Sequence, residues 1–420
     1  GLGELGVGRQ ALLNIKKTDF RADQILVSAR TGLGELGLPA DTLSPLSMAS
    51  TVLAPGGLGK LSLDEMNRVL SGRTYSAAVN QAGDAYIFAG ATKPADLQLE
   101  LQVLAAYLTD PGLRGASFEQ TKAMFPQILA QLGATPRGVF QRDASGLLAS
   151  GDARETTPTA EQIAAIQIDD IRSGVRSALA QGPVEITVVG DVDVDAVIAA
   201  VGSTFGALPS RGQAHTPPAG STVRKFPAPT ATPVQLYHTG PAEQALGFVA
   251  WPTTDQVEDR KTARQLSILS DVLQLRLNDE IREKQGLAYS PSAGSTASDT
   301  YPGYGFISVT AETPPAALPK LFETVDAIAA DLRDNPISED ELNRARRPAV
   351  ERIRRSMADN GYWLTQLSQA QSDPATLDQT RNQIATLEAV TAADLQALAR
   401  QYLKSDSAWR ATVTAQPAAQ

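Results

Sequence analysis

The chain has 420 residues, of which 42% are hydrophobic and 20% are charged, and its formal net charge is −9 at pH 7. This composition is typical of a soluble globular protein with room for two or three domains. A negative net charge argues against a general nucleic-acid-binding surface, and the absence of cysteine excludes disulfides, thiolate metal sites and cysteine nucleophiles. No apolar run approaches the length of a membrane span. Because the chain begins at Gly1, without a methionine or a signal-like segment, we expect a processed product or a fragment.

The first half of the chain combines short apolar runs, bounded by turn residues, with longer stretches of helical periodicity. The short runs predict strands at residues 11–15, 24–29, 75–79, 85–90 and 184–189. The periodic stretches predict helices at residues 46–54, 62–70, 96–108, 118–132, 160–180 and 194–201. Residues 133–158 show little periodicity and support no assignment.

The second half repeats this mixture. Strands are predicted at residues 234–238, 245–251, 304–311 and 409–415, and helices at 316–332, 391–403 and from Ser338 onward with a kink at Pro348. A long helix is predicted from residue 266, with a buried face marked by leucines at three- and four-residue steps: Leu266, Leu269, Leu273 and Leu277. It ends at Gly286, because glycine most readily takes the left-handed conformation that closes a helix.

A repeated signature sets the number of domains. Residues 163–190 and 387–415 each read as a helix followed by a strand, and the copies align at matching positions: Ile166 with Val390, and Asp170 with Asp394. Such a match at the end of each half predicts duplication of a domain of roughly 200 residues. We therefore predict two homologous domains, residues 1–210 and 234–420, joined by a proline-rich linker at 211–233. Strands and helices do not alternate strictly, so the predicted class is α+β, with helices packed on a mainly antiparallel sheet in each domain.

The end of the long helix is the candidate site. Arg282 and Tyr289 are seven positions apart in the sequence, and the predicted stop at Gly286 lies between them. A guanidinium and a phenol can then leave two differently oriented elements toward one spot. A purely structural reading is also open, since a cation in the last helical turn favours the helix dipole and a tyrosine often packs at a domain edge.

The block Arg282 to Gly294, REKQGLAYSPSAG, resembles the second half of the insulinase/pitrilysin zinc metallopeptidases. In that family an arginine and a tyrosine seven residues apart close the active site from the side opposite the metal. Further similar pieces occur in order at residues 185–209, 238–255 and 359–364. The resemblance implies that this chain is half of a clam-shaped peptidase.

The sequence departs from the family at the metal site. The catalytic half carries zinc on an HxxEH helix with a downstream glutamate ligand, but this chain contains only His215 and His238 and no HxxEH. Alignment on the turn at Gly56 places the expected ligand positions at residues that cannot form a strong zinc set: Ser47, Ser50, Thr51 and Gln127. We therefore expect no metal or other cofactor in this chain, with zinc held by a partner half. Both histidines are expected to be structural or solvated.

The resemblance implies a non-catalytic half or subunit that encloses a peptide or unfolded-protein substrate. Arg282 and Tyr289 would stabilise the tetrahedral intermediate at the zinc of an HxxEH-bearing partner, as a heterodimer or within a longer polypeptide. Gly294, Gly303 and Gly305 are candidate substrate-binding positions that would let a peptide backbone approach, although hairpin geometry explains them equally well. The alternative is a structural or assembly subunit without a role in turnover. The compartment is unknown, with a bacterial periplasm favoured by the resemblance.

Two glycine patterns invite a different function. Gly32, Gly34 and Gly37 satisfy GxGxxG, as do Gly1, Gly3 and Gly6. A dinucleotide site would need a helix that opens inside the motif, with an acidic residue about 20 residues further on. Pro39 and Pro45 interrupt the region after the second motif, so a plain loop is the favoured interpretation there.

Overall fold

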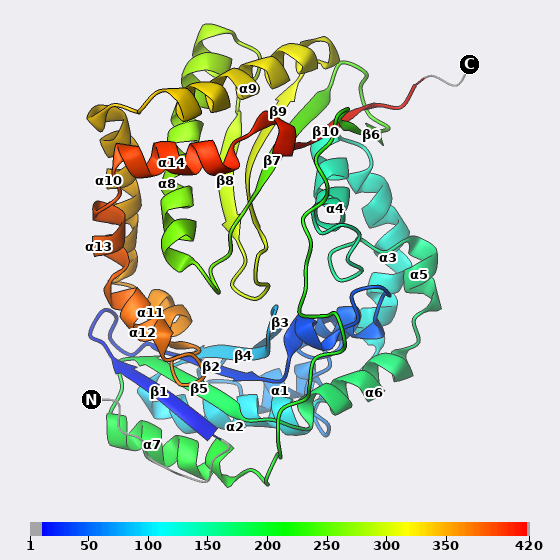
Figure 1. The fold of residues 1–420 in the computed structure, drawn as a ribbon. Coiled ribbons are helices and arrows are strands. Elements are labelled where there is room, and N and C mark those ends of the chain that lie inside the picture. The colour runs from blue at the N-terminus through cyan, green and yellow to red at the C-terminus, as the bar shows by residue number, and fades with distance from the viewer. Residues whose placement is uncertain (1–10, 418–420) are drawn as a thin grey trace. The chain divides into compact units, whose positions relative to one another are not determined.

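In a computed structural model, which describes residues 11–417, the chain forms two five-stranded sheets flanked by helices (Figure 1). The first sheet contains β1 (Ala11–Lys17), β2 (Ile25–Thr31), β3 (Ala78–Gln81), β4 (Tyr86–Thr92) and β5 (Val184–Gly190). The second contains β6 (Val234–His238), β7 (Ala245–Thr253), β8 (Ser292–Ala297), β9 (Gly305–Thr313) and β10 (Trp409–Ala415). The second glycine-rich motif is therefore described, whereas the first, at Gly1 to Gly6, lies outside the described residues.

The two sheets have the same topology. Their strand orders are β1-β5-β2-β4-β3 and β6-β10-β7-β9-β8, so in each the last strand in sequence lies between the first two. The β1–β5 and β6–β10 pairs are parallel and all other pairs are antiparallel. The predicted α+β class, with two equivalent and mainly antiparallel sheets, is confirmed.

Fourteen α-helices connect or cover these strands within the described residues. Those of the first half are α1 (Leu63–Val69), α2 (Leu97–Thr109), α3 (Ala116–Leu132), α4 (Pro136–Leu148), α5 (Ala160–Ala165), α6 (Ile168–Leu179) and α7 (Val194–Ser203). Those of the second are α8 (Arg260–Leu277), α9 (Leu318–Asp334), α10 (Glu339–Ser356), α11 (Asn360–Leu367), α12 (Ala375–Arg381), α13 (Gln383–Glu388) and α14 (Ala392–Tyr402).

Some elements differ from the sequence prediction. The helix expected at 46–54 is a 3₁₀-helix, Pro45–Thr51, and the stretch 133–158 contains α4. Strand β8 was not predicted, because its sequence SAGSTA lacks the large β-branched and aromatic side chains that mark strands. Helix α10 continues through Pro348.

The chain divides into two compact units that are not continuous in sequence. The first unit comprises residues 1–124, 159–221 and 353–382, and the second comprises 125–158, 222–352 and 383–420. Segment 125–158 from the first half thus belongs to the second unit, and segment 353–382 returns to the first. The boundary between 221 and 222 lies inside the predicted linker; the homologous-repeat limits of 1–210 and 234–420 remain a proposal.

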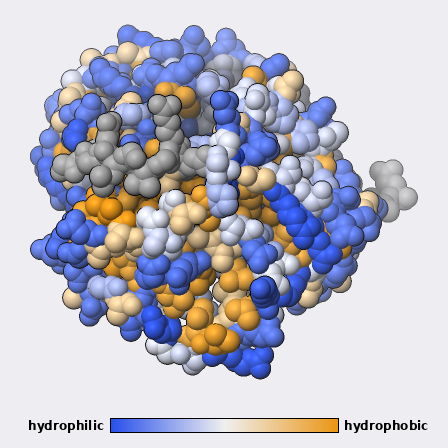
Figure 2. Space-filling view, turned by 90° about the horizontal axis from the view of Figure 1, so that it is seen from below, coloured by the Kyte–Doolittle hydropathy of each residue, from blue (hydrophilic) through white to orange (hydrophobic). Residues whose placement is uncertain are grey.

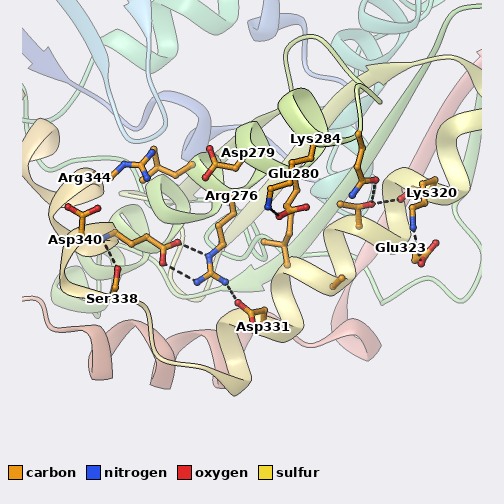
Figure 3. Close-up of a pocket in the computed structure, with 16 residues that line it drawn as sticks. Arg276, Asp279, Glu280, Lys284, Lys320, Glu323, Asp331, Ser338, Asp340 and Arg344 are labelled. Atoms are coloured by element: carbon orange, nitrogen blue, oxygen red, sulfur yellow. Dashed lines mark hydrogen bonds and ion pairs between the residues drawn. The ribbon is translucent and has the colours of Figure 1, made fainter.

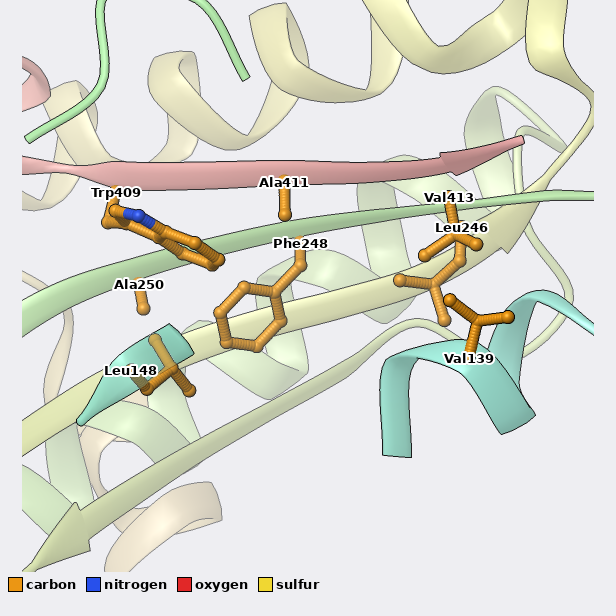
Figure 4. Close-up of a cluster of buried hydrophobic side chains, with 8 residues drawn as sticks. All are labelled: Val139, Leu148, Leu246, Phe248, Ala250, Trp409, Ala411 and Val413. Carbon is orange, nitrogen blue, oxygen red and sulfur yellow. The ribbon is translucent and has the colours of Figure 1, made fainter. Parts of the chain in front are cut away.

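Segment 125–158 contributes side chains to the hydrophobic core of the second unit. Val139 and Leu148 of α4 point at alternate residues of β7 and β10, with Phe248 between them (Figure 4). The opposite face of β7 carries Gly247, where an added Cβ would lie 2.7 Å from the side chain of Leu321 on α9. Helices therefore cover both faces of this sheet, as the uninterrupted apolar sequence of β7 requires.

A buried carboxylate binds segment 353–382 to the rest of the first unit. Glu185 of β5 is almost fully buried and accepts hydrogen bonds from Asn14 Nδ2 at 2.8 Å and from the backbone N–H of Gln371 at 2.8 Å. It also accepts from the N–H and hydroxyl of Ser372, at 3.2 and 2.6 Å. Since charge-assisted hydrogen bonds are the strong ones, Glu185 fixes the loop between α11 and α12 on this sheet.

The surface mixes both kinds of side chain. Figure 2 shows one face of the molecule, on which hydrophobic and hydrophilic residues are interspersed. Exposed large hydrophobic residues include Leu63 and Val69 of α1 and Val194 of α7. Within residues 11–417, no helix combines the length and apolar character needed to cross a bilayer.

Candidate functional site

The candidate site is carried by α8. Its N-terminus is capped by Asp259, whose carboxylate accepts from the N–H of Thr262 at 3.1 Å. The predicted leucine stripe is fully buried: Leu266, Leu269, Leu273 and Leu277 each have 0% exposure. This burial fixes the helix as a rigid base for the residues that follow it.

Helix α8 does not end at Leu277 but changes its winding. Residues Asn278–Lys284 form a π-helix, in which the N–H of Gln285 donates to the carbonyl of Glu280 at 3.1 Å. The segment closes at Gly286, which has φ +61°, and the N–H of Leu287 donates back to the carbonyl of Ile281 at 2.9 Å. The predicted left-handed glycine is confirmed. Short π-segments inside helices are rare and often accompany functional sites.

The structure brings Arg282 and Tyr289 together. The guanidinium carbon of Arg282 lies 5.2 Å from the centroid of the Tyr289 ring, within the range of a cation–π contact. Tyr289 is 81% exposed although it is a large aromatic residue, and Arg282 is exposed as well. The pair therefore presents a phenolic O–H and a guanidinium, both hydrogen-bond donors, to solvent.

The segment that carries Tyr289 is held by its backbone. Thr313, at the end of β9, donates its hydroxyl to the carbonyl of Leu287 at 2.6 Å, and the neighbouring Ala288 is buried. Leu287 and Ala288 are thus anchored, and they position the exposed side chain of Tyr289, which follows them.

The three candidate glycines have different local roles. Gly303 has φ +72° and donates its N–H to Asp255 Oδ2 at 2.6 Å, so the turn between β8 and β9 requires it. A Cβ on Gly305 would lie 2.0 Å from the carbonyl oxygen of Thr254. Gly294, on the sheet edge in β8, has open space around its α-carbon. Its role, and any substrate contact at all three positions, stays a prediction.

A polar pocket of about 570 Å³ lies against the π-helix, between α8, α9 and α10. Arg276 forms ion pairs across it with Glu341 and Asp331, as Figure 3 shows for Asp331. Lys284 pairs with Glu280, and this hydrogen bond raises the pKa of Lys284. The Arg276 pairs join α8 to α9 and α10, whereas the Lys284–Glu280 pair lies within the π-helix.

The positions aligned with the zinc site carry no suitable ligands. Ser47, Ser50 and Thr51 lie in the 3₁₀-helix Pro45–Thr51, and Gln127 lies in α3. In the part of the chain that the structure describes, no group of three or more His, Asp or Glu side chains could hold a metal ion. Hydroxyl and amide groups do not replace the imidazole and carboxylate ligands of zinc.

Both histidines make structural hydrogen bonds. His215 Nε2 lies 2.9 Å from the carbonyl oxygen of Ser177. His238 is buried, with Nε2 at 2.9 Å from the carbonyl oxygen of Gln244 and Nδ1 accepting from the N–H of Gly240 at 3.0 Å. Their surroundings contain backbone groups rather than metal ligands.

The glycine loop after β2 is not a dinucleotide site. Only the 3₁₀-helix Gly34–Gly37 follows the strand, and β2 is antiparallel to both of its neighbours, β4 and β5. The fingerprint needs a parallel βαβ unit with an α-helix that opens at the glycines. Gly34 instead packs against the backbone, since a Cβ there would lie 2.1 Å from the carbonyl oxygen of Ala82.

Two α+β sheets of the same topology and an exposed arginine–tyrosine pair are the features to set beside known proteins. Residues 165–348 match the family model described as the Peptidase M16 inactive domain. The resemblance to the non-zinc-binding half of the insulinase/pitrilysin peptidases is therefore confirmed.

Individual proteins that are similar to this chain carry the names of peptidases or proteases. The chloroplastic stromal processing peptidase of Arabidopsis thaliana is 22% identical over 428 residues, covering 89% of this chain and 33% of that protein. An uncharacterised zinc protease of Mycobacterium leprae is 27% identical over 220 residues, covering 52% of this chain and 48% of that protein. The periplasmic protease PqqL from Escherichia coli has a TM-score of 0.78 at 17% identity, covering 95% of this chain and 44% of that chain. This chain thus spans less than half the length of each, and the likeness to PqqL shows the fold.

Proposed function

We propose that this chain is the non-catalytic half of a zinc metallopeptidase and supplies Arg282 and Tyr289 to a reaction at a zinc ion held by a partner half. The observation that carries the proposal is the contact of these two side chains at 5.2 Å together with the 81% exposure of Tyr289. A large aromatic residue left in solvent beside a guanidinium has little structural use. Both groups are available to a ligand instead.

The chemistry follows from the charges that develop in peptide hydrolysis. Attack of water on the scissile carbonyl places negative charge on its oxygen, and donors aimed at that oxygen stabilise the tetrahedral intermediate. The Tyr289 hydroxyl would donate to the oxygen, and Arg282 would hold the peptide backbone and add positive potential. Zinc in the partner half would activate the water and polarise the carbonyl.

The proposal implies a partner half, a class of substrate and a cellular location. An HxxEH-bearing half, as a separate subunit or as another part of a longer polypeptide, would bring the metal ligands and the general base. The substrate would be a peptide or an unfolded protein enclosed between the halves. Similarity to the periplasmic PqqL supports a periplasmic location.

The test is peptide hydrolysis by this chain combined with an HxxEH-bearing partner. Arg282→Ala and Tyr289→Phe should each lower kcat by about 10²-fold, because removal of one oxyanion donor typically has that effect. Matched controls are Tyr237→Phe, on another exposed tyrosine of the same unit, and Arg381→Ala, on an exposed arginine paired with Asp378. Both should keep full activity.

Two outcomes would contradict this role. A loss of less than twofold in both site variants would reject a catalytic contribution. A stable complex that never hydrolyses peptides, with any partner, would instead favour the alternative of an assembly subunit without a role in turnover.

A further inference from the structure

We propose that Gln274 is a positioning residue that sets the spacing of Arg282 and Tyr289; its importance for turnover rests on the proposed function, whereas its effect on the pair does not. Gln274 lies on α8, one turn before the π-helix begins at Asn278. Its side chain makes three hydrogen bonds, which join α8 to the two segments that carry the pair.

The first two bonds hold the chain after Tyr289. Gln274 Nε2 donates to the carbonyl of Pro291 at 3.0 Å, and Gln274 Oε1 accepts from the N–H of Ala293 at 2.7 Å. The primary amide therefore pairs with this backbone as a neighbouring strand would. This fixes the register in which the chain leaves Tyr289 and enters β8.

The third bond reaches the other segment. Gln274 Nε2 also lies 3.1 Å from Oδ1 of Asn278, the first residue of the π-helix that carries Arg282. An amide nitrogen has two hydrogens, so it can donate to Pro291 and Asn278 at once. One side chain thus ties the start of the arginine segment to the end of the tyrosine segment.

These bonds matter because the pair has few contacts of its own. Arg282 and Tyr289 are both exposed, so packing does not hold their relative position. Displacement of about 1 Å at a reacting group can lower a rate by 10²-fold. A loss of the Gln274 bonds is therefore expected to act on the Arg282–Tyr289 geometry before it acts on the fold.

The variant that tests this is Gln274→Met, which keeps the side-chain length and the helix propensity but removes all three hydrogen bonds. Asn278→Ala removes only the link to the π-helix. The matched control is Gln256→Met: Gln256 Nε2 donates to the carbonyl of Ala297 at 3.0 Å, at the far end of the same strand β8.

The first measurement uses this chain alone. In NMR spectra, the Tyr289 ring should shift the Arg282 Hδ resonances upfield, and Tyr289→Leu defines the value without the ring. Gln274→Met and Asn278→Ala should each remove at least half of this shift, and Gln256→Met should leave it unchanged. An unchanged shift in Gln274→Met overturns the inference. If Gln274→Met does not fold, Gln274→Glu replaces it, since a carboxylate keeps the bond from Ala293 and loses both donors.

The second measurement uses the complex with the HxxEH-bearing partner. Gln274→Met should lower kcat by about tenfold or more with KM unchanged, but less than twofold further when Tyr289 is already phenylalanine, because a positioning residue acts through the group it positions. Equal losses in both backgrounds would contradict positioning. If Tyr289→Phe itself has no effect, the proposed function fails, and the NMR result still decides whether Gln274 positions the pair.

Discussion

At the scale of single residues, a buried carboxyl group outside the candidate site governs how the first unit responds to pH. Glu100 of α2 is 0% exposed, and burial raises its pKa from 4.5 to about 7, against the opposing effect of a hydrogen bond from the N–H of Ser76. Its carboxyl packs directly on β4, where a Cβ on Gly90 would lie 1.8 Å from Oε1. The folded chain therefore favours the protonated form of Glu100.

Glu100 should make the chain less stable as pH rises. The unfolded chain loses this proton near pH 4.5 and the folded chain near pH 7, so the contribution is fully present below pH 4.5, is lost between these values and is flat above them. The loss amounts to at most about 3 kcal/mol. Glu100→Gln keeps an acceptor for Ser76 and should unfold at a higher temperature than the wild type at pH 8, but not at pH 4.5.

Thermal unfolding at a series of pH values checks this. Glu119→Gln, on an exposed glutamate of α3, should follow the wild-type profile. A pH profile of Glu100→Gln parallel to that of the wild type would show that Glu100 does not carry the effect.

Residue roles were predictable only where spacing along the chain carries them. Arg282, Tyr289 and Gly286 follow from the end of one helix, and the structure brings the first two together around the third. Glu100 and Gln274 gave no signal, because a polar residue on a helix is ordinarily read as solvated. The hydrogen-bond partners of Glu100 and Gln274 include backbone groups in other segments, and the sequence does not show that these segments lie beside the two helices.

At the scale of elements, the π-helix Asn278–Lys284 is the feature that sequence periodicity could not reveal. The apolar residues Leu273, Leu277 and Ile281 keep a four-residue step through the change of winding, so the pattern predicts one continuous helix. Widening the last turns changes the direction of each side chain before Gly286. The orientation of Arg282 thus depends on a local geometry that hydrophobic spacing does not encode.

The closing turn of this element can be tested by a matched pair of glycine substitutions. Gly286 and Gly294 both have open space where a Cβ would lie, but only Gly286 has a positive φ, of +61°. Gly286→Ala should therefore lower the free energy of unfolding by about 1 kcal/mol through backbone strain alone. Gly294→Ala should change it little. Denaturant unfolding measures both, and equal effects would contradict the strained-turn explanation.

At the scale of the whole molecule, the sequence predicted two repeats because each hydrophobic pattern is local, but it did not predict which segments associate. Segment 125–158 packs with the second unit and segment 353–382 with the first. Val139 of α4 has its partners at Leu246 and Val413, and Glu185 has its partners at Gln371 and Ser372. Contacts between residues so distant in sequence leave no periodic trace.

This exchange of segments predicts the behaviour of a chain cut in the linker. A protease site introduced at Gly220, which has open space around it, yields one fragment that contains 125–158 and another that contains 353–382. Each unit then draws on both fragments. The cut chain should elute as one species in size-exclusion chromatography while a denaturing gel shows two bands. Separation of the fragments under native conditions would contradict this exchange.

The strand order has a consequence for biosynthesis. The ribosome delivers β7 long before β10, yet β7 pairs with β10 on one side, and β6 pairs only with β10. Until β10 emerges from the ribosome, the almost wholly buried strand β7 has one unpaired edge, and the first unit is incomplete until residues 353–382 have been synthesised. The two units therefore cannot fold to completion one after the other as the chain is synthesised. An apolar strand edge that stays unpaired during synthesis is prone to aggregation, so we expect the nascent chain to depend on protection of β7 until β10 has been made.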